Sequence, residues 1–180
     1  MREVIGHEIL RSGVVELSRL VIVLATQHEL QGAEKRSGNV DDPLYPVLLE
    51  ELVDAERLDF IFEEVTGLGP TIASKLSQTK LGTNRYLDVD PSLDEREKFG
   101  IRRVTNNPFM IGSPPDAAFA DWQFHEVHAK REELWIQRMT EREFTKSLMI
   151  CGIAHGFSFT FRLQSAKFTV KTATYVKRGI

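Results

Sequence analysis

The fold class is decided by residues 20–25, LVIVLA, an unbroken apolar run that is followed directly by polar Thr26-Gln27-His28. Continuous rather than alternating apolarity is typical of a strand buried on both faces, as in a parallel sheet. Similar short runs at 58–62 and 146–152 and a shorter one at 86–90 predict three more strands. Residues 168–176 alternate polar and apolar residues, which predicts a strand at the edge of the sheet.

Helix-like stretches separate these strands. Apolar residues spaced by three and four predict helices over 43–57, 71–81, 119–144 and 157–166, whereas residues 1–19 fit either a helix or a strand. Two long polar stretches, 31–42 and 102–116, are candidate lids or surface insertions. The alternation predicts an α/β fold: one domain over residues 1–180, with an open, mostly parallel sheet flanked by helices and an edge strand near the C-terminus.

Composition narrows the function classes. The 180 residues carry a formal net charge of −3, and no basic excess points to nucleic acid or an anionic membrane as the main partner. No apolar run is long enough to cross a bilayer, and the first eight residues contain acids and a histidine where a secretory signal needs an apolar stretch. With a single cysteine, Cys151, the sequence predicts a cytoplasmic protein, and it leaves a homo-oligomer open.

The strand ends carry the candidate chemistry. In open α/β sheets ligands bind beyond the carboxyl ends of the strands. Here those ends supply His28, Glu63-Glu64, Asp88 with Asp90, and His155. His28, Glu64 and His155 are therefore candidate catalytic residues and candidate ligands for a divalent metal such as Mn²⁺, Co²⁺ or Zn²⁺. Glu64 is favoured over Glu63 because it lies further toward the edge, although strand alternation also allows Glu63.

Arg131 is the fourth candidate site residue. On a helix it shares an otherwise apolar stripe with Phe124, Val127 and Leu134, so it should point inward and need an acidic partner or a bound anion. A salt bridge to Asp88, Asp90 or Glu64 and a contact with substrate both remain open. The nearby His125 and His128 are more typical of surface positions than of ligands.

Other chemistries have weaker signals. Cys151 lies four residues before His155, but its place inside an apolar strand favours a buried structural thiol over a nucleophile. The sequence has no GxSxG, P-loop or GxGxxG motif, which argues against the common serine hydrolases, Walker NTPases and dinucleotide-binding dehydrogenases.

Four motifs in order resemble the TraB/TIKI-type superfamily, which includes ChaN-like and erythromycin-esterase-like proteins. Residues 151–155, CGIAH, resemble its closing GxxH motif, and residues 25–28, ATQH, resemble the first with alanine in place of glycine. Its acidic strand end is matched by Glu63-Glu64, and its helix arginine by Arg131. The resemblance implies a pocket of two histidines, a glutamate and an arginine, associated in relatives with metal-dependent peptide cleavage, ester hydrolysis or haem-linked binding.

Three functions follow as hypotheses. The first is a small hydrolase-like enzyme acting on a small molecule or peptide, metal-dependent or using His28 polarised by Glu64, with Arg131 stabilising negative charge. The second is a binding module for an anionic small molecule. The third is an interaction protein that uses the phenylalanine-rich segment after His155 and the edge strand. We expect His155→Ala to leave the fold nearly intact while removing metal or ligand binding.

Overall fold

The structure is a computed structural model, and it describes residues 19–32, 42–65, 69–101 and 127–177. Within these ranges five strands form one sheet in which every neighbouring pair is parallel. The strands are β1 (Leu20–Thr26), β2 (Phe60–Glu63), β3 (Tyr86–Asp88), β4 (Lys146–Gly152) and β5 (Thr169–Tyr175), in the order β3-β2-β4-β1-β5. The predicted open parallel sheet is confirmed, with β5 at one edge.

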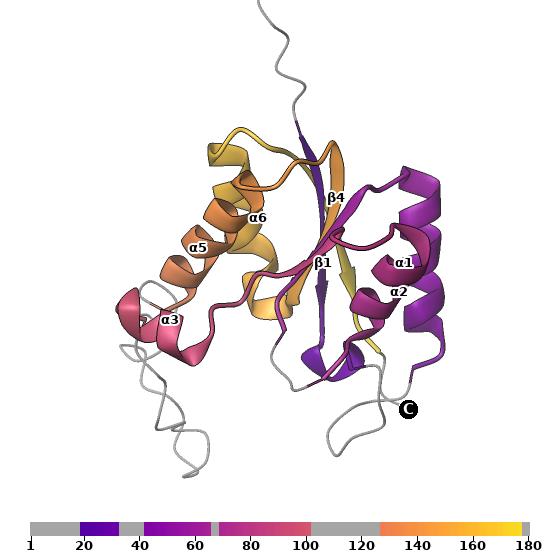
Figure 1. Cartoon of the computed structure of the whole chain (residues 1–180), viewed down its shortest axis with the longest axis horizontal. Helices are drawn as coiled ribbons and strands as arrows, with labels where there is room; N and C mark the ends of the chain where they lie inside the picture. Colours follow the sequence, from indigo (N-terminus) through magenta and orange to yellow (C-terminus); the bar gives the residue numbers. More distant parts are fainter. Residues whose placement is uncertain (1–18, 33–41, 66–68, 102–126, 178–180) are drawn as a thin grey trace, which may run out of the picture.

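Helices cover both faces of this sheet (Figure 1). The helices α1 (Leu44–Glu56) and α2 (Ile72–Lys80) lie on one face, and α5 (Ala129–Thr140) and α6 (Gly156–Ser165) lie on the other. A short helix, α3 (Leu93–Lys98), follows β3, while the 3-10 helices η1 (His28–Leu30) and η4 (Ile153–His155) directly follow β1 and β4. None of the helices described for the chain combines the length and apolar character that a bilayer crossing requires.

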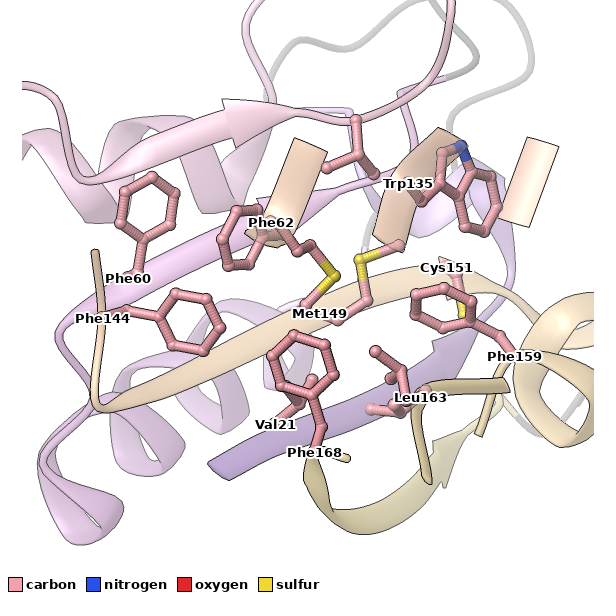
Figure 2. Close-up of a cluster of buried hydrophobic side chains, with 13 residues drawn as sticks. Val21, Phe60, Phe62, Trp135, Phe144, Met149, Cys151, Phe159, Leu163 and Phe168 are labelled. Atoms are coloured by element: carbon pink, nitrogen blue, oxygen red, sulfur yellow. The ribbon is translucent and has the colours of Figure 1, made fainter. Parts of the chain in front are cut away.

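Each face of the sheet has its own hydrophobic core. The core under α5 and α6 is rich in aromatic and sulfur-containing side chains, and Figure 2 shows Phe62, Phe144, Met149 and Phe168 among them. The core under α1 and α2 is mainly aliphatic and contains Leu24 and Ile150. Six of the seven residues in both β1 and β4 are buried, as the unbroken apolar runs predict for central strands.

Two helix predictions need correction. The helix expected over 119–144 ends at Thr140 rather than Phe144, because the chain must turn so that Phe144 can pack against the Phe62 ring, 5.2 Å between centroids, before β4 begins. The helix α3 was not predicted, although its N-cap residue, Ser92, forms a reciprocal capping box with Glu95. The other predicted helices and strands lie within a few residues of those observed.

Several predictions fall outside the described residues. These include most of the two long polar stretches, residues 1–18, the first part of the helix expected over 119–144, and Phe124 and His125.

Candidate functional site

The four predicted site residues come together at the carboxyl edge of the sheet, around Glu64. His28 lies in η1 after β1, Glu64 follows β2, His155 ends η4 after β4, and Arg131 points in from α5. The Nε2 atom of His28 lies 3.7 Å from Glu64 Oε2, and the Nε2 atom of His155 lies 3.6 Å from Glu64 Oε1. Arg131 donates from Nη2 to Glu64 Oε1. The strand-end rule therefore identified one spatial cluster.

Glu64 is a fully buried carboxylate that its surroundings hold ionised. The Gly152 backbone amide donates to Glu64 Oε2 at 2.8 Å, while Arg131 is bound to the other oxygen. Burial alone would raise the pKa of Glu64, but Arg131, the two histidines and the Gly152 amide together lower it below its usual value. Strand alternation places Glu63 on the opposite face of the sheet, so Glu64 rather than Glu63 lies beside Arg131 and the two histidines.

Arg131 is buried, as the apolar stripe on its helix predicts, with its side chain only 10% exposed. It donates to Asp90 Oδ1 from Nε at 3.0 Å and from Nη2 at 2.7 Å. Its guanidinium carbon also lies 5.3 Å from the centre of the Trp135 ring. Of the three salt-bridge partners proposed for it, Asp88, Asp90 and Glu64, Arg131 thus binds the last two at once. These bonds use Nε and Nη2. Among the described residues, no carboxylate is bonded to the third nitrogen, Nη1.

His155 is buried and bonded to an acid that the sequence analysis missed. Its Nδ1 atom lies 2.8 Å from Glu132 Oε1, which also accepts from the Ser158 hydroxyl at 2.6 Å. The other oxygen of Glu132 forms a salt bridge with Arg162, at 3.0 Å from its Nε atom. An N–H on Nδ1 directed at Glu132 leaves Nε2 as an acceptor, which faces Arg131 Nη1 at 3.4 Å.

The surroundings of His155 indicate that it also has a structural part in the fold. Its Nε2 atom faces Arg131, and its ring packs against Trp135 with 4.7 Å between centroids. Removing the ring would take a partner from the buried Glu132 carboxylate and open a cavity. We accordingly replace the expectation that His155→Ala leaves the fold nearly intact with a marked loss of stability.

His28 is the member of the cluster that reaches solvent. Its side chain is 34% exposed, whereas the side chains of Glu64 and His155 are 1% and 3% exposed. Its ring lies directly over Gly152: a Cβ atom at that glycine would come within 2.4 Å of His28 Nε2. On its other side, the Nδ1 atom lies 3.3 Å from Gln31 Oε1. His28 is thus held between a buried carboxylate and an amide while remaining accessible.

The residues proposed as metal ligands do not fit that role well as they are arranged. A cation shared by Glu64 and His155 would need the space between Glu64 Oε1 and His155 Nε2, where the Arg131 guanidinium lies. In the part of the chain that the structure describes, no group of three or more His, Cys, Asp and Glu side chains is arranged to hold a metal ion. Metal binding stays a prediction, and it requires Arg131 to move.

A second buried carboxylate, that of Glu63, lies on the opposite face of the sheet, and its pKa is shifted upward rather than downward. Glu63 Oε2 accepts from the hydroxyls of Thr71 at 2.5 Å and Tyr86 at 2.8 Å, while Oε1 has no hydrogen-bond partner among the described residues. Burial raises the pKa of Glu63 to about 7, and the two hydroxyls only partly offset that effect. Consecutive glutamates thus differ in charge near neutral pH because they face different sides.

Two remaining candidates are settled by burial. Cys151 is fully buried, and burial raises the pKa of its thiol, as expected of a structural cysteine rather than a nucleophile. His128 is half-buried rather than a surface residue, with its ring 4.3 Å from that of His155. Burial and the nearby His155 and Arg131 lower the pKa of His128 to about 4, so it is neutral at neutral pH.

Comparison of the chain with protein-family models and with curated proteins gives no match.

Proposed function

We propose that the chain is a small hydrolase-like enzyme in which His28 carries out acid–base chemistry on a small-molecule or peptide substrate. The observation that carries the proposal is the environment of His28: a solvent-accessible imidazole whose Nε2 lies 3.7 Å from the buried Glu64. A carboxylate that is itself fixed can orient a histidine and stabilise its protonated form during proton transfer. Here the Gly152 amide and Arg131 fix Glu64.

The reaction that we propose is hydrolysis of an ester or amide. His28 takes a proton from water, the water oxygen attacks the carbonyl carbon, and the bond to the leaving group then breaks as His28 returns the proton to that group. Negative charge develops on the carbonyl oxygen. We assign Arg131 Nη1 as the donor to this oxygen, because the other two guanidinium nitrogens are bound to Glu64 and Asp90, whereas Nη1 faces the His155 ring nitrogen at 3.4 Å and has a second N–H.

The test is hydrolysis by the full chain beside two variants of the same 3-10 helix. Activity on p-nitrophenyl esters and on a mixed peptide library should fall by about 10²–10⁴-fold in His28→Ala, the usual contribution of general acid–base catalysis. Glu29→Ala is the matched control, because Glu29 is adjacent but solvent-exposed. Equal activity in His28→Ala and Glu29→Ala would refute the proposal.

Metal dependence is tested separately. Metal-stripped protein is titrated calorimetrically with Mn²⁺, Co²⁺ and Zn²⁺ beside a His28→Ala/His155→Ala double variant. Stoichiometric binding that the double variant loses would support a metal-dependent hydrolase and would mean that Arg131 yields its position. Activity of the metal-stripped protein would support the metal-free reaction.

A second candidate function is binding of an anionic small molecule without turnover. It is favoured by the accessible His28 ring in the same cluster as the Arg131 guanidinium, both of which are groups that can bind a carboxylate or phosphate. Saturable binding of acetate that is lost in His28→Ala, with no hydrolysis of any ester or peptide, would favour this function.

Further parts of the proposal rest on the sequence. The resemblance to the TraB/TIKI-type superfamily rests on His28, Glu64, Arg131 and His155, which lie together in the fold. We propose a cytoplasmic location from the single cysteine, and small-molecule or peptide partners from the accessible His28. Self-association and an interaction role for the segment after His155 remain predictions; Phe157 and Phe161 are exposed there, whereas Phe159 is in the core.

A further inference from the structure

A separate open pocket of about 1000 Å³ lies beyond the end of β3, between α3 and α5. Four arginines line it: Arg96, Arg131, Arg138 and Arg142. His28, Glu64 and His155 do not line it, so the pocket is distinct from the proposed acid–base site. Of the four predicted site residues, Arg131 alone also lines this pocket.

Four acids line the pocket as well: Asp88, Asp90, Glu95 and Glu141. Internal hydrogen-bond donors occupy Asp90 and Glu95 on both oxygens and Asp88 on one, where the Val65 and Asp90 amides bind Oδ1. Both carboxylate oxygens of Asp90 are bound by arginines, Oδ1 by Arg131 and Oδ2 by Arg96. Glu95 accepts from Arg138 on one oxygen and from the Ser92 amide, at 2.8 Å, on the other. The Ser92 contacts and Arg138 lower the pKa of Glu95 to about 2, so this carboxylate stays ionised.

The guanidinium groups are less completely used than the acids. Each carries five N–H donors. Arg138 bonds to the Asp90 carbonyl oxygen from Nη1, at 3.1 Å, and to Glu95 from Nη2. Arg142 is exposed at the rim, and its side chain makes no hydrogen bond or ion pair with any residue of the described ranges. Arg138 and Arg142 therefore have N–H donors that are not used by the described residues and that a ligand could bind.

Part of the wall is apolar. Val65, Leu87 and Leu93 line the same pocket as the arginines. A ligand that uses both kinds of surface would place oxygen acceptors against the guanidinium groups and a short apolar portion against these side chains. Guanidinium groups pair especially well with carboxylate and phosphate oxygens, because two parallel N–H bonds match the spacing of two oxygens.

We propose that this pocket binds a small oxyanion, a carboxylate or a phosphoryl group, attached to a compact apolar moiety, with Arg142 as the main free cation. Arg138 and Arg96 supply further N–H donors from the wall. The site does not depend on catalysis at His28, because it shares only Arg131 with that cluster.

The experiment follows the arginine Nε–Hε signals of the full-length ¹⁵N-labelled chain by NMR during titration with sodium phosphate and, separately, with sodium butyrate at constant ionic strength. We expect saturable shifts for Arg138 and Arg142 with one or both probes. Butyrate alone would identify a carboxylate site, and phosphate alone a phosphoryl site. The same titration in a His28→Ala background should be unchanged, which separates this proposal from the proposed hydrolysis.

Two variants locate the binding. Arg142→Ala should weaken it by about tenfold, the loss expected for one charge-assisted contact. The substitution should fold normally, because the Arg142 side chain has no internal partner in the described structure. Lys75→Ala, which removes an exposed positive charge on α2, should change nothing. No saturable shift with either probe, no effect of Arg142→Ala, or an equal loss in both variants would overturn the proposal.

Discussion

Gly152→Ala should displace His28 with little cost to the fold. The added Cβ would lie 2.4 Å from His28 Nε2 and 2.8 Å from Cε1, roughly 1 Å inside the normal contact distance. The Gly152 backbone, at φ −61° and ψ 148°, is an ordinary extended conformation that alanine adopts without strain. Because the one-third-exposed ring can rotate toward solvent, we expect a loss in unfolding free energy of about 1 kcal/mol or less, at the low end for overpacking.

Gly156→Ala is the matched control. Its Cβ would lie 2.8 Å from the Ala25 Cβ, between α6 and β1, where the methyl group of Ala25 has no rotamer that relieves the clash. We expect this variant to lose about 1–3 kcal/mol of unfolding free energy while His28 stays in place. The two glycines should thus separate the position of His28 from packing stability.

Urea unfolding followed by the fluorescence of the buried Trp135, together with the His28 Cε1–H NMR signal, measures both effects. Gly152→Ala should move the His28 signal and reduce any His28-dependent hydrolysis by about 10²-fold or more. Gly156→Ala should lower stability and leave that signal unchanged. An unmoved His28 signal in Gly152→Ala, or a larger stability loss there than in Gly156→Ala, would refute the reasoning.

Three further substitutions test the buried charges. The folded-state pKa of Glu63 is raised from 4.5 to about 7, so the native state holds this proton more tightly than the unfolded chain does. The free energy of unfolding should therefore fall by about 3 kcal/mol as the pH rises from below 4.5 through 7. Urea unfolding at pH 5 and pH 8 should show that fall in the parent but not in Glu63→Gln, and equal pH dependence in both would contradict it. Arg131→Met should cost about 3–5 kcal/mol by the same assay, since it leaves the Glu64 carboxylate buried without its arginine and leaves Asp90 with Arg96 alone; a loss under 1 kcal/mol would argue against the ion-pair network. His155→Ala should cost about 2–4 kcal/mol, and an unchanged urea midpoint would show that its bond to Glu132 contributes little.

The sheet could be predicted from the sequence because the apolar pattern of each central strand matches its burial in the folded chain. The run at residues 20–25 is apolar at every position, which only a strand covered on both sides satisfies, and β1 has helices on both faces. The end of α5 could not be predicted in the same way. Helical periodicity continues toward Phe144, but packing of that ring against Phe62 requires the chain to leave the helix earlier. The missed α3 did carry a local signal, the Ser92–Glu95 capping box.

The candidate site was predictable only in part. The topology rule for parallel sheets brings His28, Glu64 and His155 to one edge without knowledge of any contact. Glu132 could not be found in this way, because a glutamate in a charged stretch of helix normally faces solvent. Its burial depends on His155 and Arg162, which come from segments more than twenty residues away. The distinction between an exposed His28 and a buried His155 likewise required the packed structure.

The adjacent glutamates at the end of β2 also bear on how the chain finds its strand register. If β2 slipped by one residue against β4, Glu63 and Glu64 would exchange faces, and so would Phe62 and Ile61. A slip in one direction would bring Glu63 to Arg131 but would put Phe62 against the hydroxyls of Thr71 and Tyr86. A slip in the other direction would bring Glu64 to those hydroxyls and put Val65 beside Arg131, which would lose one of its buried carboxylate partners. The pair therefore penalises the commonest pairing error of a short strand and confers fidelity on assembly of the sheet.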